Sequence, residues 1–151
     1  MKQSKKILIA NRGVIAIRAL RAARELGYSV ASVYSTVDRD QKHLKLSDEA
    51  ICIGPPETKD SYLNEAAIIS AAELSGADAI YPGFGFLAEN ASFADKCRES
   101  GFKFIGPDPE VIAIMGDKIK AKELAKSLNI PVVPGYELSL IHISEPTRPR
   151  L

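Results

Sequence analysis

Short apolar runs alternate along the chain with longer segments in which apolar residues recur at helical spacing. Continuous apolar runs of this length are typical of strands buried on both faces. They predict five strands, at residues 6–10, 29–34, 50–53, 79–81 and 103–105. The helical spacing predicts five helices, at residues 14–26, 64–75, 92–100, 110–115 and 118–128. Gly27, Gly76 and Gly101 end the first three of these helices.

Strands that alternate with helices in this way indicate βαβ units and an α/β fold. We expect a Rossmann-like parallel sheet of about five strands over residues 5–107, with helices on both faces. In such sheets ligands lie beyond the carboxyl ends of the strands, where the strand order reverses. With the order 3-2-1-4-5, that point places the loop of residues 11–13 beside the loop of residues 82–90.

Composition narrows the functional classes. The 151 residues are 46% hydrophobic and 26% charged, as in ordinary globular domains, and the net charge of +1 argues against bulk electrostatic binding of nucleic acid. No apolar run approaches the roughly 18–20 residues of a membrane span. Cys52 and Cys97 cannot form a disulfide framework, so we expect free, buried thiols in a cytoplasmic protein. The two histidines, His43 and His142, form no Cys/His cluster with zinc spacing.

The loop Asn11-Arg12-Gly13 follows a strand and opens a helix. A dinucleotide-binding dehydrogenase would carry G-x-G-x-x-G here, but only Gly13 is present. The helix N-terminus favours an anion. The alternative is that Gly13 only permits a tight turn while Arg12 forms an ion pair elsewhere.

The loop after the fourth predicted strand carries two glycines, Gly83 and Gly85, on either side of Phe84. They allow a ligand to approach the backbone closely. Phe84 and Phe86 lie in the core or form the wall of a site. The alternative is a simple strand-to-helix turn, with Asn90 and its neighbours capping the next helix.

A break between the last two predicted helices contains Asp117 and Lys118. Asp117 is placed to cap the second helix, and Lys118 falls in its first turn. A lysine there is electrostatically unfavourable unless an anion is nearby. The alternative is an ordinary exposed lysine.

Six segments occur together in the order and spacing of the biotin carboxylase family. They are residues 9–13, 38–40 with His43, 61–64, 81–90, 104–107 and 115–118. Over residues 5–136 the sequence therefore resembles this family, which includes the biotin carboxylase subunit of acetyl-CoA carboxylase and the N-terminal parts of pyruvate and propionyl-CoA carboxylases.

The resemblance implies a reaction. Such an enzyme phosphorylates bicarbonate with ATP and Mg²⁺ (or Mn²⁺), then carboxylates biotin held on a biotin carboxyl carrier protein or domain. It also implies a carboxyltransferase component as partner and a homodimer in the full-length protein. The family's catalytic and metal-binding residues should lie beyond residue 151, so we expect the chain alone to be inactive.

The resemblance also assigns site residues. It places Lys118 at the ATP phosphates. It places Phe84, where the family usually has Tyr, on the biotin side of the site, in a loop with Gly83, Gly85 and Glu89. It places three residues of the first helix at a homodimer interface, namely Arg18, Arg21 and Glu25, for which the alternative is a solvated charged stripe.

These interpretations divide the chain into three parts. Residues 1–107 are expected to form the domain that precedes an ATP-grasp domain, residues 108–137 to form connecting helices and the start of the ATP-grasp domain, and residues 138–151 to be a non-native tail. Two alternatives stay open at this point. One is another ATP-grasp carboxylate–amine ligase, and the other is a non-catalytic nucleotide-binding module.

Overall fold

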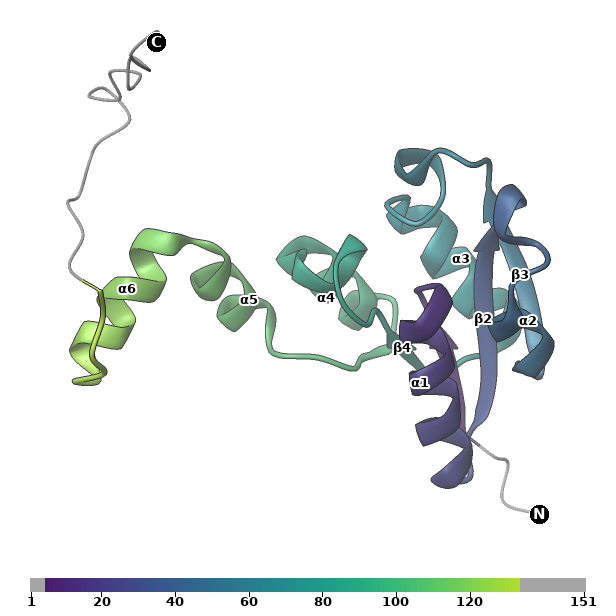
Figure 1. Ribbon diagram of the computed structural model, residues 1–151, viewed down its shortest axis with the longest axis horizontal. Helices are drawn as coiled ribbons and strands as arrows, with labels where there is room; N and C mark the ends of the chain where they lie inside the picture. The colour runs from purple at the N-terminus through teal and green to yellow at the C-terminus, as the bar shows by residue number, and fades with distance from the viewer. Residues whose placement is uncertain (1–4, 134–151) are drawn as a thin grey trace, which may run out of the picture. The chain divides into compact units, whose positions relative to one another are not determined.

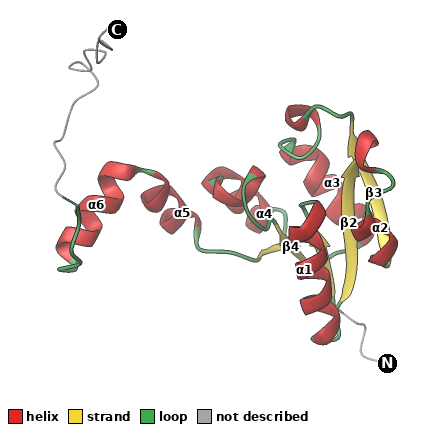
Figure 2. Cartoon of the chain, viewed as in Figure 1, coloured by secondary structure: helices red, strands yellow, loops and turns green. Residues whose placement is uncertain are grey.

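The computed structural model describes residues 5–133, which belong to two compact units divided between Ala113 and Ile114. The first unit contains a five-stranded sheet (Figures 1 and 2). Its strands are β1 (Lys6–Ile9), β2 (Ser29–Ser35), β3 (Glu49–Gly54), β4 (Ala79–Tyr81) and β5 (Lys103–Phe104). All pairings are parallel, which confirms the predicted fold class, and the order β3-β2-β1-β4-β5 is the one assumed above for such sheets.

The helices are α1 (Gly13–Glu25), α2 (Lys42–Leu46), α3 (Glu65–Ser75), α4 (Ala91–Glu99), α5 (Pro109–Gly116) and α6 (Lys118–Ser127). Three short 3₁₀ helices, η1 (Thr36–Asp38), η2 (Thr58–Asp60) and η3 (Phe86–Glu89), lie in loops. The predicted helices are all present, and each of their ends lies within one residue of the predicted position. The sequence pattern missed α2 and the 3₁₀ helices because three to five residues are too few to show a periodicity.

Both faces of the sheet are covered, as predicted. Successive side chains of β1 point to opposite faces, so Leu8 and Ile9 enter different core clusters. Leu8 belongs to the larger cluster, which includes side chains of α3 and α4. Ile9 packs with Ala16 and Leu20 of α1. This alternation explains why β1, at the centre of the sheet, reads as one continuous apolar run.

Asparagine side chains set the starts of two helices. The Asn64 side chain accepts a hydrogen bond from the Ala67 amide at 3.1 Å and caps α3. Asn90 caps α4 in the same way, accepting from the Phe93 amide at 3.0 Å. The predicted capping role of the segment around Asn90 is therefore confirmed.

The two cysteines have different environments. Cys97 is fully buried, and burial raises the pKa of its thiol to about 12. Cys52 is exposed, so the expectation that both thiols are buried is wrong for this residue. It lies on β3, which is an edge strand, and alternate side chains of that strand face outward. Within residues 5–133 no helix is long and apolar enough to cross a membrane. His142 and the predicted tail lie outside the described residues.

Candidate functional site

Asn11 joins the two loops that the strand order was expected to bring together. Its side-chain Nδ2 donates to the carbonyl oxygens of Pro82, at 2.7 Å, and Phe84, at 2.9 Å. Its Oδ1 accepts from the Arg12 amide at 2.8 Å. Asn11 is buried, and each of its side-chain polar atoms has a partner. The loops after β1 and β4 therefore form one structure at the carboxyl edge of the sheet, as predicted.

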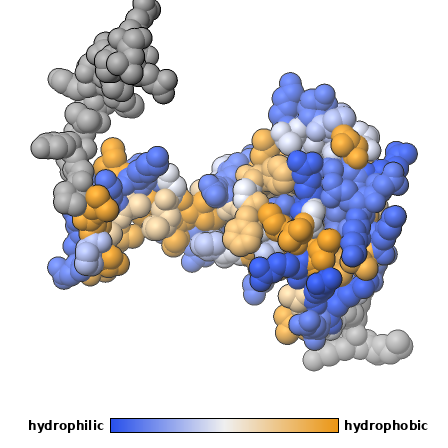
Figure 3. All heavy atoms as spheres, viewed as in Figure 1, coloured by the Kyte–Doolittle hydropathy of each residue, from blue (hydrophilic) through white to orange (hydrophobic). Residues whose placement is uncertain are grey.

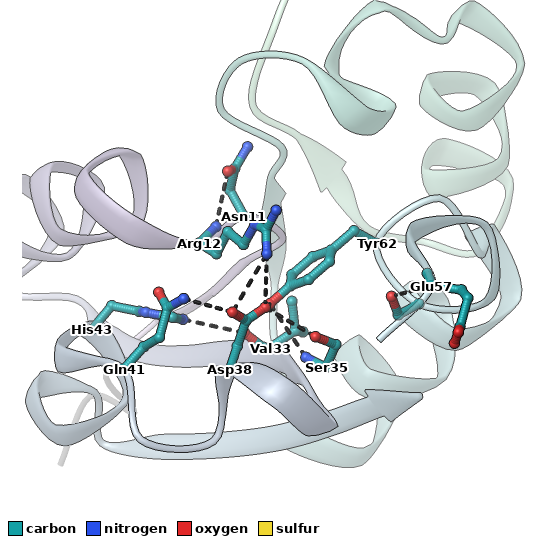
Figure 4. A network of polar contacts seen from close by, with 10 residues as sticks. Asn11, Arg12, Val33, Ser35, Asp38, Gln41, His43, Glu57 and Tyr62 are labelled. Atoms are coloured by element: carbon teal, nitrogen blue, oxygen red, sulfur yellow. Dashed lines mark hydrogen bonds and ion pairs between the residues drawn. The ribbon is translucent and has the colours of Figure 1, made fainter. Parts of the chain in front are cut away.

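The carboxylate of Asp38 lies at the centre of a polar cluster beside these loops (Figure 4). Its Oδ2 accepts from the Tyr62 hydroxyl at 2.7 Å and from the Ser35 hydroxyl at 2.9 Å. Its Oδ1 accepts from Gln41 at 2.5 Å. Arg12 completes the cluster with an ion pair, in which Nη1 lies 3.2 Å from Oδ2. Only 3% of the Asp38 side chain is exposed, so this charge is compensated almost entirely within the protein.

The cluster holds Asp38 in its charged form. Burial alone would raise the pKa of the Asp38 carboxyl, but hydrogen bonds from Tyr62, Ser35 and Arg12 outweigh it, and the pKa lies below its usual value. Burial and the hydrogen bond to Asp38 raise the pKa of the Tyr62 hydroxyl. Both pKa shifts favour the same protonation states, in which a neutral Tyr62 donates a hydrogen bond to a charged Asp38.

Arg12 and Tyr62 together contact the aromatic ring of Phe86. The rings of Tyr62 and Phe86 are stacked, with centroids 5.0 Å apart and planes 13° from parallel. The Arg12 guanidinium carbon lies 5.4 Å from the Tyr62 ring centroid and 5.8 Å from that of Phe86. Phe86 is half-buried and packs against the larger core cluster, so it lies at the margin of the core.

The backbone of the glycine-containing loop is unusual at two adjacent residues. Gly85 has φ +65° and ψ −158°, a region that essentially only glycine populates. Phe86 follows with φ +43°, which is strained for an aromatic residue. Phe84 is 71% exposed and is therefore not a core residue. Glu89, at the end of η3, is also exposed. The loop thus combines a strained backbone with hydrogen bonds from Asn11, which lies outside it.

Arg12 and Gly13 are placed as the sequence alternative expected, with Gly13 in a tight turn and Arg12 in an ion pair. Gly13 has φ +62° at the tight turn into α1, and Arg12 pairs with Asp38. No side-chain cap is present at the start of α1.

The charged residues of α1 lie on its outer surface. Arg18, Arg21 and Glu25 are all exposed, and among the described residues no ion pair joins them. Beside them runs a mainly apolar groove of about 710 Å³ between α1 and the β1-β4-β5 side of the sheet. Its lining includes Val14, Arg18, Leu26 and Phe84. Figure 3 shows apolar and polar residues side by side on the surface of the first unit.

Lys118 is the first residue of α6, in the second unit. Asp117 caps this helix by accepting from the amides of Ile119, at 2.9 Å, and Lys120, at 3.2 Å, as predicted. The Lys118 side chain is exposed. The described residues contain no group of three or more His, Cys, Asp or Glu side chains that could hold a metal ion.

The sequence patterns include Asp38 and Tyr62 within motifs but assign neither a role, and they do not single out Gln41. The signal that could have found Asp38 is its position, because it comes shortly after the second predicted strand, at the edge of the sheet where ligands bind. Nothing in the sequence near Asp38 shows that it also pairs with Tyr62 and Arg12, which lie 24 and 26 residues away in the chain.

Comparison with known proteins identifies relatives that match most of the chain. A family model described as "Biotin carboxylase, N-terminal domain" matches residues 3–112. The "Biotin carboxylase" of Haemophilus influenzae is 57% identical over 132 residues, which is 87% of this chain and 30% of that protein. The chain thus spans about a third of the length of the curated relatives it matches.

Solved structures give the same result. The biotin carboxylase–β,γ-ATP complex from Campylobacter jejuni is 51% identical, with a TM-score of 0.84 over 87% of this chain and 30% of that one. The biotin carboxylase domain dimer of the Hydrogenobacter thermophilus 2-oxoglutarate carboxylase, solved with MgADP, ADP and bicarbonate, is 46% identical. Its TM-score is 0.84, over 90% of this chain and 30% of that one.

Proposed function

The chain belongs to the biotin carboxylase family through its N-terminal domain, and we propose that it is the first part of an enzyme that uses bicarbonate and Mg-ATP to carboxylate carrier-bound biotin. The family match over residues 3–112 is the observation that carries this proposal. Family membership also favours it over the two alternatives left by the sequence, another ATP-grasp ligase and a non-catalytic nucleotide-binding module.

The loop of residues 82–90 is the proposed biotin side of the site. The Phe84 ring is exposed and offers an apolar wall for the ligand ring. Gly85 leaves the backbone beside that ring uncovered by side chains, whereas Gly83 is packed against Asn11 and Ile15. The carboxylate of Glu89 is exposed at the end of the same loop. Asn11 already donates to the Phe84 carbonyl, and the exposed ring is the part of Phe84 that we assign to the ligand.

Lys118 is the proposed contact to the ATP phosphates. The Asp117 carboxylate caps α6 and occupies two of its first amides, so Lys118 itself supplies positive charge at this helix start. A bound phosphate would offset the unfavourable position of a cation at a helix N-terminus. Mg²⁺ would reduce the negative charge of the phosphates, and its ligands belong to the proposed remainder of the protein.

Arg18, Arg21 and Glu25 are proposed to form part of a two-fold dimer interface. Support comes from their exposure on one helix and from the apolar groove beside Arg18, a combination suited to a partner surface. The related H. thermophilus domain was solved as a dimer. In an isologous contact each side chain occurs at two symmetric positions of the interface, once from each subunit.

The remaining parts of the proposal concern the division of the chain, its partners and its location. Residues 1–107 would form the domain before the ATP-grasp domain, residues 108–137 the connection to it, and residues 138–151 a non-native tail. A carrier protein or domain and a carboxyltransferase component would be its partners. A cytoplasmic location is consistent with two free thiols.

ATP cleavage by the longer protein tests the activity. We expect cleavage that depends on bicarbonate, and transfer of labelled bicarbonate carbon to free biotin. The chain of 151 residues alone should show neither, because one lysine at a helix start is not a complete phosphate site. Biotin carboxylation by the chain alone, or none by the longer protein, would contradict the proposal.

The exposed ring of Phe84 provides a sharper test of the biotin side. Phe84→Ala in the longer protein should raise KM for biotin without lowering the melting temperature, since the ring is outside the core. Leu74→Ala removes another exposed apolar side chain, 77% exposed near the end of α3 and outside the groove that Phe84 lines, and is the matched control.

A further inference from the structure

The glycine-containing loop is held in a strained shape by residues outside it. Phe86 has a positive φ, and such a conformation costs about 1–3 kcal/mol and persists only where surrounding contacts impose it. Two side chains from other loops supply the contacts to its ring, Tyr62 by stacking and Arg12 by lying near the ring. Neither comes from the neighbouring sequence, so contacts that hold this ring come from outside the loop.

Arg12 and Tyr62 depend in turn on one carboxylate. Asp38 Oδ2 is 2.7 Å from the Tyr62 hydroxyl and 3.2 Å from Arg12 Nη1. Gln41 and Ser35 satisfy the rest of the carboxylate and orient it (Figure 4). Tyr62 is 1% exposed while the Arg12 side chain is 42% exposed, so the network runs from the interior to the surface at the loop.

We propose that Asp38 is a positioning residue for the biotin-side loop. None of the hydrogen bonds or ion pairs of its carboxylate goes to a residue of that loop. It acts by holding Arg12 and Tyr62 together, and these hold the Phe86 ring, which sets the turn from Gly85 to Glu89. The exposed groups of the loop, Phe84 and Glu89, lie on either side of this anchored point. The role in biotin binding rests on the proposed function, whereas the anchoring itself does not.

Asp38→Asn is the direct test of the anchoring. It keeps the size of the side chain but replaces an acceptor oxygen and the charge that Arg12 and Tyr62 share. The matched control is Asp48→Asn. Asp48 also pairs with an arginine, Arg24, at 3.1 Å, and accepts from the Val30 amide near the start of β2, away from the loop.

Amide hydrogen exchange in the chain of 151 residues measures the loop directly. The Ala88 amide donates to the Gly85 carbonyl at 2.8 Å, and the Asn90 amide to the Leu87 carbonyl at 3.2 Å. We expect both amides to exchange faster in Asp38→Asn than in Asp48→Asn, after correction for the unfolding free energy of each variant. Equal exchange in the two variants would mean that Asp38 has only a general structural role, and would overturn the proposal.

Tyr62→Phe keeps the experiment decisive if Asp38→Asn does not fold. It removes only the hydroxyl that joins the ring to Asp38 and leaves the ring able to stack on Phe86. The same faster exchange at Ala88 and Asn90 is expected, to a smaller extent. Unchanged exchange in this variant would contradict a network that acts through Tyr62.

Steady-state kinetics of the longer protein then separates binding from stability. Because small displacements of a positioning group have large kinetic effects, Asp38→Asn should raise KM for free biotin about tenfold and leave KM for ATP unchanged. A rise in both KM values, or in neither, would overturn the role in biotin binding. If the wild-type protein carboxylates no biotin, the proposed function fails, while the exchange result still decides whether Asp38 anchors the loop.

Discussion

The side-chain amide of Asn11 lies directly against Gly83. A methyl group at residue 83 would be 2.9 Å from Nδ2 of Asn11 and 2.7 Å from a methyl carbon of Ile15. Gly83 also has φ +72°, which is unfavourable for any residue with a Cβ atom. The loop can therefore approach Asn11 only because residue 83 is glycine.

Gly83→Ala should destabilise the first unit by about 2–4 kcal/mol, from the backbone strain and the crowding at Asn11 together. Gly101→Ala is the matched control, because its φ is +83° but a Cβ there meets nothing within 4 Å. It should cost only about 1–2 kcal/mol, the strain alone. Urea unfolding of the two variants measures the difference, and equal losses would show that the contact with Asn11 is not restrictive.

His43 should make the folded state sensitive to mild acid. Burial lowers the pKa of the imidazole from 6.5, and its contacts with the Val33 carbonyl and with the charge of Asp38 offset this only in part. Its Nδ1 is buried without a partner among the described residues. The unfolded chain therefore binds a proton more readily, so stability is lost as the pH falls below about 6.5.

His43→Gln should flatten the dependence of the unfolding free energy on pH between about 7.5 and 5. His142→Gln, at the chain's other histidine, is the control. The effect of the Asp38 carboxylate falls in a different window, because Asp38 keeps a pKa below 3.8 and loses its contribution only in stronger acid. A slope for His43→Gln equal to that of the wild type would contradict this assignment.

Lys118→Gln should raise KM for ATP in the longer protein. The loss of one charge-assisted contact, about 1.5–3 kcal/mol, corresponds to about 10- to 150-fold. Lys120→Gln removes an exposed cation two residues away on the same helix, and is expected to leave KM for ATP near the wild-type value. Similar effects of the two substitutions would return Lys118 to the class of ordinary surface lysines.

Arg21→Glu should shift the longer protein from dimer to monomer. Arg21 is exposed, so the reversal of its charge leaves the fold intact. In a two-fold interface the substitution changes the contact at two symmetric positions. Sedimentation velocity at several concentrations measures the shift. Lys45→Glu, a charge reversal at an exposed position of α2, is the control. A persistent dimer in Arg21→Glu would mean that this face of α1 is solvated.

Local features of the sequence determined the five strands, the five longer helices and their order along the chain. The run from Lys6 to Ile9 shows a strand because its residues after the lysine are all apolar, and Asn64 and Asn90 show helix starts because a cap acts within three residues. These signals extend over one or two turns of chain. With the common strand order assumed, the rule that ligand loops lie where the order reverses also brought the two loops together.

Only the tertiary structure decided which side chains meet at those loops. Arg12 pairs with a carboxylate 26 residues away, and Asn11 holds a carbonyl 73 residues away. The tertiary structure also decided which residues of one type are exposed. Phe84 is exposed while Phe86 is stacked on Tyr62, and Cys52 is exposed while Cys97 is buried. Residue type is the same within each pair. The difference comes from which element packs against each side chain, and that is a property of the folded chain.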